Sequence, residues 1–484
     1  MELGRLLDGI EVLAAAAEPG LEIRGVQYDS RNIAPGELFV AISGYQTDGH
    51  RFIEKAKQAG AAAVVCERVP ETEIPYILVP SSRAALAQLG ANWFGRPAEK
   101  MVMLGVTGTN GKTTSTYLLK HILEKTRGAR VGLIGTIQNM IGDEVLPTER
   151  TTPESFELQR LFAQMLEAGC THVVMEVSSH ALALHRADAI FFRVGAFSNL
   201  TEDHLDFHRT MEEYCRAKAL LFTRCETGCV NADDPYAAQI TQNASCRVLR
   251  YAVEDDRAEL TAKNVRLRPD RVEFEAVTGG ESCRMELGIP GLFSVYNALC
   301  VTQMALALGV GLQEIAASLK TARGVKGRAE VVPTPGKDYT VLIDYSHTPD
   351  SLEKILKTVR GFCKGRILAV FGCGGDRDPI KRPIMGRIGA QLSDLCIITS
   401  DNPRTEDPNA IIAQIAGGAR EIPGAKIKIL ENRPAAIAWA MAQAGKDDVI
   451  VLCGKGHETY QEVGHEKLHM DEREIVASVL ENEV

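Results

Sequence analysis

A glycine-rich segment that ends in a lysine and two threonines is the part of this sequence that most directly suggests chemistry. It consists of Gly108, Thr109, Asn110, Gly111, Lys112, Thr113 and Thr114. Glycines let backbone N–H groups close on phosphate oxygens, a lysine adds positive charge, and a threonine hydroxyl can bind Mg²⁺. The generic phosphate-binding loop has glycine where this chain has Val106, so a plain glycine-rich turn stays the alternative. The apolar run before the segment and the helical pattern after it favour nucleotide binding.

Acidic and imidazole side chains follow two later apolar runs. Glu176 stands near the end of the run 171–177, a position typical of a Walker-B acid that holds Mg²⁺ directly or through water. The segment 199–208 carries two histidines, among them His204, and three acids, which favours a metal site over a solvated loop. Lys218 lies in a mostly apolar helical pattern, and such a lysine usually extends its ammonium group to solvent.

Four apolar runs in the last third of the chain each end in a polar cluster. The runs are 341–343, 367–371, 395–399 and 449–453. Helical patterns separate them, which predicts a parallel, doubly wound sheet whose carboxyl edge gathers all four clusters. Ligands bind at that edge in such sheets. The glycines at 372–375 lack the third spaced glycine of a dinucleotide-binding fingerprint, so we do not predict a dinucleotide site there.

Two short polar segments could bind a ligand or could be ordinary local structure. The loop 29–31, with Ser30 at its centre, combines an acid, a hydroxyl and a guanidinium. Thr151 and Thr152 precede a helical pattern in which we expect Thr152 as the N-cap and Pro153 at the first helical position. A threonine pair at a helix N-terminus can also bind an anion.

Composition is that of an ordinary globular protein. The chain has 484 residues, of which 45% are hydrophobic and 24% charged, and its net charge of −9 argues against a general nucleic-acid surface. Twelve cysteines without paired metal spacing predict reduced thiols. Since we find neither a signal peptide nor a tract that could span a membrane, we expect a cytoplasmic protein without membrane insertion.

The elements that must position these residues fall into three predicted α/β domains. A small N-terminal domain covers 1–98 and ends near the Gly-Arg-Pro turn at 95–97. The central domain, 99–327, surrounds the glycine-rich loop, and the glycines at 324–327 mark its end. The doubly wound sheet occupies the last domain, 328–484.

Ten short motifs follow one another across nearly the whole chain. They are GTNGKTT, TTP, EVSSHAL, NLTEDHLDFH, YCRAK, GVKGRAE, DYSHTPDSL, FGCGGDRD, SDNPRTEDP and GKGHE. In this order they closely resemble the Mur ligases of peptidoglycan synthesis. The resemblance implies a small N-terminal α/β domain for a UDP-linked substrate, a central P-loop NTPase-like parallel sheet for ATP, and a C-terminal Rossmann-like sheet for the incoming amino acid.

The resemblance implies an ADP-forming ligase that uses ATP and Mg²⁺. ATP would phosphorylate the terminal carboxylate of UDP-N-acetylmuramoyl-L-alanyl-D-glutamate, and an amine of the amino acid would displace the phosphate. Lys112 is expected to contact the transferring phosphate, and Lys218 to be present as a carbamate. The expected Mg²⁺ ligands are Thr113, Glu176, His204 and carbamylated Lys218. The expected contacts to adenine, phosphate and ribose are Asn297, Arg328 and Asp344.

The same resemblance implies contacts to the other two substrates. Those to the UDP-sugar-dipeptide are Ser30, Thr151, Thr152, Ser178 and Arg186. Those to meso-diaminopimelate are Arg377, Asp401, Asn402, Pro403, Arg404, Gly454 and Glu458. The Asp-Asn-Pro-Arg form at 401–404 is that of members that add meso-diaminopimelate, whose distal carboxylate suits Arg404 and whose distal ammonium suits Glu458. L-lysine has no distal carboxylate.

Three other functions stay open at this point: a lysine-adding tripeptide synthetase, a folylpolyglutamate synthase, and a non-catalytic nucleotide-binding regulator. The chain departs from the family pattern at Leu184, Arg209 and Ser294, and relatives commonly have glycine at the position of Arg209. We expect a monomer.

Overall fold

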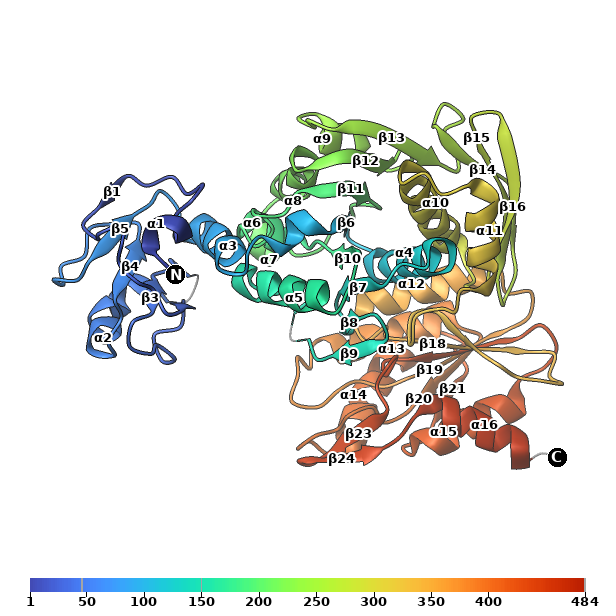
Figure 1. The fold of residues 1–484 in the computed structure, drawn as a ribbon. Coiled ribbons are helices and arrows are strands. Elements are labelled where there is room, and N and C mark those ends of the chain that lie inside the picture. Colours follow the sequence, from blue (N-terminus) through green and yellow to red (C-terminus); the bar gives the residue numbers. More distant parts are fainter. Residues whose placement is uncertain (45–46, 149, 483–484) are drawn as a thin grey trace. The chain divides into compact units, whose positions relative to one another are not determined.

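The computed structural model of the protein describes residues 1–44, 47–148 and 150–482 (Figure 1). Its internal contacts divide the chain into two compact units. One unit comprises Met1–Glu259 with Cys300–Gly311, and the other comprises Leu260–Leu299 with the chain from Leu312 onward. The predicted α/β class is confirmed, whereas the domain boundaries at 98 and 327 stay a prediction. No helix in the described part of the chain is both long and apolar enough to cross a membrane.

The N-terminal part of the first unit is a small sheet covered by helices. Its elements are α1 (Leu3–Leu6), β1 (Ala14–Ala15), β2 (Val26–Gln27), β3 (Leu38–Val40), a 3₁₀ helix (Gly49–Phe52), α2 (Ile53–Gln58), β4 (Ala63–Cys66), β5 (Tyr76–Leu78) and α3 (Ser82–Trp93). The strand order is β1-β5-β4-β3-β2, parallel except for β1. Ser81 caps α3 by accepting a hydrogen bond from the Ala84 N–H. The buried face of α3, with Leu86 and Leu89, then packs into the core beneath the sheet.

The larger sheet of the first unit carries the glycine-rich loop. Its elements are a 3₁₀ helix (Pro97–Lys100), β6 (Val102–Thr107), α4 (Lys112–Arg127), β7 (Val131–Ile134), β8 (Asn139–Ile141), β9 (Glu144–Leu146), α5 (Ser155–Glu167), β10 (His172–Glu176), α6 (Ser179–Ala183), β11 (Phe192–Phe197), α7 (Leu205–His208), α8 (Met211–Ala219), a 3₁₀ helix (Leu220–Thr223), β12 (Cys225–Asn231), α9 (Ala237–Thr241) and β13 (Arg247–Ala252). The order is β13-β12-β11-β6-β10-β7-β8-β9, and it is parallel from β13 to β7. Continuous burial of β6 from Met103 to Thr107 is typical of a parallel strand covered on both faces.

The second unit contains an antiparallel hairpin stack and a doubly wound sheet. Its elements include β14 (Leu260–Leu267), β15 (Val272–Thr278), β16 (Glu281–Leu287), α11 (Leu312–Thr321), β17 (Glu330–Val332), β18 (Thr340–Asp344), α12 (Pro349–Arg360), β19 (Ile367–Phe371), α13 (Lys381–Leu392), β20 (Leu395–Ile398), α14 (Pro408–Arg420), β21 (Ile427–Ile429), α15 (Arg433–Gln443), β22 (Val449–Cys453), β23 (Tyr460–Val463), β24 (Glu466–His469) and α16 (Glu472–Asn482), and α10 (Leu292–Ala307) contributes residues to both units. Strands β14, β15 and β16 pair antiparallel in that order.

The doubly wound sheet has the strand order β17-β18-β22-β19-β20-β21. It is parallel from β18 to β21, and only β17 runs antiparallel at the edge. The four strands predicted from the apolar runs are β18, β19, β20 and β22, and their carboxyl ends share one edge. The prediction that the four polar clusters lie together at that edge is therefore confirmed.

Candidate active site

The residues that directly follow β11 fix the conformation of the glycine-rich loop. Gly108 has a φ of +148°, and a Cβ atom there would lie 1.9 Å from the Ser198 Oγ, so only glycine fits. The Thr109 N–H donates to the Asn199 carbonyl at 2.8 Å, and the Asn110 N–H donates to the Asn199 side chain at 2.9 Å. The loop leads directly into α4, whose N-terminal N–H groups can bind an anion.

Two lysines meet on one carbonyl oxygen of this loop. Lys112 Nζ and Lys218 Nζ donate to the Gly108 carbonyl at 2.8 and 2.9 Å. Lys218 is 1% exposed, so its ammonium group does not extend to solvent as that of a lysine in such a pattern usually does. Burial, and then the charge of Lys112, lower the pKa of Lys218 well below its usual value. The neutral amine that this favours is a nucleophile, the form that carbamate formation requires.

Glu176 lies at the end of β10, in register with Val106 of β6, and is 1% exposed. Its Oε1 accepts the Thr136 N–H at 2.9 Å and its Oε2 accepts the Thr136 hydroxyl at 3.0 Å. A buried carboxylate needs such donors or a cation. Thr136, which was not singled out from the sequence, lies two residues after the end of β7.

The histidines of the segment 199–208 lie among other rings, and His204 Nδ1 is 3.6 Å from the carboxylate of its neighbour Asp203. His208 Nε2 is 2.9 Å from the Ser179 Oγ, and its ring stacks on Tyr214 with centroids 5.0 Å apart. The His204 ring lies edge-on to His180 at 4.9 Å. Among the described residues, no three side chains of His, Cys, Asp or Glu form a group that could hold a metal ion. A metal ion bound by Glu176 and His204 would therefore need a donor of another type.

The residues predicted to contact the UDP-sugar-dipeptide largely come together beside Glu176. The Thr151 hydroxyl lies 3.0 Å from that of Thr136, and the Thr152 hydroxyl donates to the Glu176 carbonyl at 2.8 Å. Thr152 also accepts the Ser178 N–H at 3.2 Å, and Arg186 Nη1 donates to the Thr152 carbonyl at 3.2 Å.

Thr152 is not the N-cap of α5, as the sequence predicted. The helix begins at Ser155, and Glu154 is the cap, its side chain accepting the Ser155 N–H. The Thr152 hydroxyl donates instead to the Glu176 carbonyl at the end of β10. Ser30 lies in the loop after β2, between Asp29 and Arg31, whose side chains bond each other: Arg31 Nε donates to Asp29 at 2.9 Å.

The predicted nucleotide contacts of the second unit include buried donors without partners. Among the described residues, the Asn297 Nδ2 and the Arg328 Nε have no hydrogen-bond partner. The Arg328 guanidinium stands over the Tyr345 ring, 5.7 Å from its centroid. Asp344, at the end of β18, accepts the Ala329 N–H at 2.8 Å and the Ser346 hydroxyl, while burial raises its pKa. Unpaired buried donors of this kind suit a polar ligand.

The strand ends of the doubly wound sheet bring the predicted amino-acid contacts together. Arg404 pairs through Nε with Glu462 at 2.7 Å and donates through Nη1 to the Gly375 carbonyl at 2.9 Å. Glu458 Oε2 accepts from the Asn402 side chain at 3.0 Å. Gly454 leaves room for Asp401, because a Cβ atom there would lie 2.4 Å from its Oδ2.

The remaining two predicted contacts are Pro403 and Arg377. Pro403 lies with Arg404 after β20 and packs against the loop after β19, where a Cβ at Gly375 would lie 1.9 Å from its carbonyl oxygen. Arg377 lies on that loop after β19, and its exposed side chain donates to the Asp376 carbonyl at 3.2 Å.

Lys455 is a site residue that the sequence reasoning passed over. Its side chain is wholly buried, and Nζ donates to Asn402 Oδ1 at 2.7 Å and to Glu458 Oε2 at 2.9 Å. The only sequence signal is its place in Gly-Lys-Gly-His-Glu directly after an apolar strand, since a lysine so close to a buried strand end needs an anionic partner.

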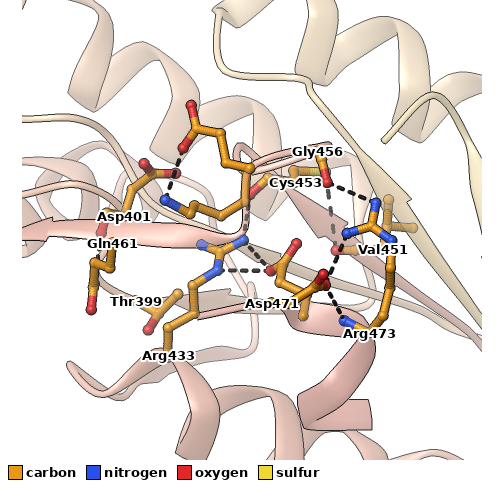
Figure 2. A network of polar contacts seen from close by, with 12 residues as sticks. Thr399, Asp401, Arg433, Val451, Cys453, Gly456, Gln461, Asp471 and Arg473 are labelled. Atoms are coloured by element: carbon orange, nitrogen blue, oxygen red, sulfur yellow. Dashed lines mark hydrogen bonds and ion pairs between the residues drawn. The ribbon is translucent and has the colours of Figure 1, made fainter. Parts of the chain in front are cut away.

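A network of ion pairs and hydrogen bonds contacts the backbone that carries Lys455 (Figure 2). Arg433, at the start of α15, donates through Nε to Glu472 at 2.8 Å and through Nη2 to the Cys453 carbonyl at 2.8 Å. Arg473 donates to Asp471 at 3.0 Å and to the Gly456 carbonyl at 3.0 Å. The network therefore fixes the backbone on both sides of Lys455.

Three family models match the chain. They are the Mur ligase family catalytic domain over residues 22–93, the Mur ligase middle domain over 106–305, and the Mur ligase glutamate ligase domain over 327–456.

Curated relatives match over the full length. A UDP-N-acetylmuramoyl-L-alanyl-D-glutamate–2,6-diaminopimelate ligase of Caldanaerobacter subterraneus subsp. tengcongensis is 46% identical, and one of Clostridium acetobutylicum is 44% identical, each over 99% of both chains. A solved structure of a ligase of the same name superposes with a TM-score of 0.77 at 29% identity, over 100% of this chain and 99% of the other. A Mycobacterium tuberculosis folylpolyglutamate synthase, 18% identical with a TM-score of 0.60 over 77% of this chain, shares the fold.

Proposed function

This chain belongs to the Mur ligase family, and from that premise we infer that it joins meso-2,6-diaminopimelate to UDP-N-acetylmuramoyl-L-alanyl-D-glutamate with the use of ATP. The product is a precursor of peptidoglycan. The observation that carries this inference is the full-length similarity, at 41–46% identity, to curated ligases named for this reaction. The resemblance first seen in the motifs is thereby confirmed at the level of the family.

The reaction requires two polyanions to meet. The γ-phosphoryl group of ATP passes to an oxygen of the D-glutamyl carboxylate, and ADP leaves. The substrate amine then attacks the acyl phosphate carbon, so that a C–N bond forms, the C–O bond to phosphate breaks, and the amine loses a proton. Lys112 and the N–H groups that open α4 would carry the phosphate charge during transfer.

We propose Thr113, Glu176, His204 and carbamylated Lys218 as the residues that hold Mg²⁺. Their fit is supported by the buried Glu176 carboxylate and by the lowered pKa of Lys218, whose neutral amine can add CO₂ and become an anionic oxygen donor. Oxygen donors of this kind suit Mg²⁺. Bound there, the ion would supply positive charge for phosphoryl transfer.

Discrimination between diamino acids rests, in this proposal, on Arg404 and Glu458. Arg404 uses Nε and Nη1 for its internal contacts, so the Nη2 edge can clamp a distal carboxylate. Among the described residues, Glu458 uses Oε2 for Lys455 and Asn402, so Oε1 can accept the distal ammonium. L-lysine offers no carboxylate and would leave Arg404 unpaired on that edge.

The test is a competition between meso-diaminopimelate and L-lysine, with purified protein, ATP and the UDP-dipeptide. We expect kcat/KM to favour diaminopimelate by at least about 30-fold, the size of a lost buried charge contact. Arg404→Met should reduce this ratio, while Arg420→Met, an exposed arginine on α14, should leave it unchanged. Equal rates for the two amino acids would refute the role of Arg404, and absence of turnover with any amino acid would favour a nucleotide-binding regulator.

The proposal also covers the cellular compartment and the oligomeric state of the protein. All twelve cysteines are free thiols, ten of them buried, which supports a reducing, cytoplasmic compartment. The roles of Asn297, Arg328 and Asp344 toward ATP, the contact of Ser30 and Arg377 with their substrates, and the monomeric state stay predictions.

A further inference from the structure

Three arginines gather around one oxygen of a single carboxylate beside Thr152. Arg186 Nε, Arg83 Nη1 and Arg150 Nη1 lie 3.3, 3.7 and 3.9 Å from Glu154 Oε2. All three distances exceed the 2.7–2.9 Å of a good charge-assisted hydrogen bond. The carboxylate therefore neutralises one of the three positive charges without binding any of the guanidinium groups tightly.

This arrangement leaves positive charge in a partly buried place. The side chains of Arg186 and Arg83 are only 12% and 19% exposed. Burial lowers the pKa of Arg186; Glu154 opposes this, while Arg150 and Arg83 lower that pKa further. Moreover, the buried Nε of Arg186, although 3.3 Å from Glu154 Oε2, makes no hydrogen bond of good geometry among the described residues. Repulsion between three partly buried guanidinium groups is unfavourable, and a second anion bound beside Glu154 would relieve it.

The cluster joins three separate segments. Arg83 lies on α3, Arg150 in the loop before α5, and Arg186 after α6. The Phe94 and Phe156 rings, 5.2 Å apart, pack α3 against α5, so the position of Arg83 is supported by the core. Arg186 also donates to the carbonyl of Thr152, which places the cluster at the border of the residues predicted to contact the UDP-linked substrate.

We propose that Arg83 and Arg150 complete, with Arg186, an anion subsite for the UDP-linked substrate. Glu154 balances one of the three positive charges, and a phosphate or carboxylate of the substrate supplies the missing second anion. The identity of this ligand rests on the proposed function, whereas the subsite itself rests on the charge cluster. The diphosphate and the dipeptide carboxylates share the required chemistry, and the experiment distinguishes them.

The first experiment compares Arg83→Met and Arg150→Met with Arg160→Met, which removes an exposed arginine of α5. We expect the KM for the UDP-dipeptide to rise at least tenfold in Arg83→Met and about threefold in Arg150→Met, with the KM values for ATP and diaminopimelate and the kcat within twofold. Arg160→Met should match the wild type. Arg150 is exposed, so its variant stays informative even if Arg83→Met folds poorly.

The second experiment measures direct binding by calorimetry with two probes, UDP and N-acetylmuramoyl-L-alanyl-D-glutamate. Weaker UDP binding in the variants assigns the subsite to the diphosphate, and weaker binding of the sugar-dipeptide assigns it to a carboxylate. If both probes bind every variant as tightly as the wild type and the KM is unchanged, the proposal is wrong. Tight probe binding without ligase turnover would refute the proposed function and leave the subsite standing.

Discussion

Replacing Arg433 by methionine should leave the buried Glu472 carboxylate of the doubly wound sheet without its counter-charge. Arg433 is 1% exposed and Glu472 is wholly buried, and the two bond at 2.8 Å. Burial raises the pKa of Glu472, Arg433 lowers it, Asp401 raises it further, and Lys455 lowers it. With Arg433 removed, the carboxylate keeps the cost of burial but loses its main counter-charge.

The expected loss in the free energy of unfolding is about 3–5 kcal/mol, the usual cost of breaking a buried ion pair by removing one partner. For a domain of this size class, 1 kcal/mol corresponds to about 2–4 °C, so Tm should fall by roughly 10 °C. The double variant Arg433→Met/Glu472→Leu removes both charges, and its unfolding free energy should lie within about 2 kcal/mol of the wild type.

Tryptophan fluorescence can report this transition selectively. The chain has two tryptophans, Trp93 on α3 and Trp439 on α15, the helix that begins with Arg433. In a Trp93→Phe background, urea unfolding monitored at Trp439 follows the domain that contains the ion pair. The wild type, both single variants and the double variant then form a complete double-mutant cycle.

The pH dependence supplies a second check. Without Arg433 the folded-state pKa of Glu472 rises further, so the folded protein holds a proton that the unfolded chain releases above about pH 4.3. Stability of Arg433→Met should therefore fall as pH rises from about 5 toward that folded-state pKa. If Arg433→Met is as stable as the wild type at neutral pH, or if the double variant is no more stable than the single, the ion-pair argument is wrong.

Three further predictions concern the loop, a strained residue and acid stability. Gly108→Ala should weaken ATP binding at least tenfold by calorimetry, because its Cβ would collide with Ser198 Oγ; unchanged affinity would show that the loop can rearrange. Arg209 has a φ of +63°, so Arg209→Gly should raise the unfolding free energy by about 1 kcal/mol in urea titration, and a loss would contradict backbone strain. Burial opposes ionisation of Asp48, yet hydrogen bonds from His50 and Arg68 lower its pKa to about 2, so its stabilising effect should be present above about pH 4 and disappear as pH falls toward 2. Asp48→Asn should lack this acid-dependent part of the Tm profile, and an identical profile would refute it.

The sequence predicted the sheet architecture well because its signals are local. Uninterrupted apolar runs followed by polar clusters identified β18, β19, β20 and β22, and the helical patterns between them required parallel pairing. The sequence marked Arg209 only as a departure from the family pattern, and its positive φ is known from the structure alone. The prediction for Thr152 failed because its hydroxyl donates to the Glu176 carbonyl at the end of β10, a distant contact that outweighs a local capping preference.

What the sequence determined by itself is the family and the reaction class, since these follow from motifs read in order along the chain. Only the tertiary structure decided the state of each charged side chain. Lys218 meets the Gly108 carbonyl across 110 positions, Arg433 meets Glu472 across 39, and Arg83 reaches Glu154 from a different helix. The physical reason is that burial and counter-charge, which set pKa values and binding properties, come from contacts between segments that are distant in sequence.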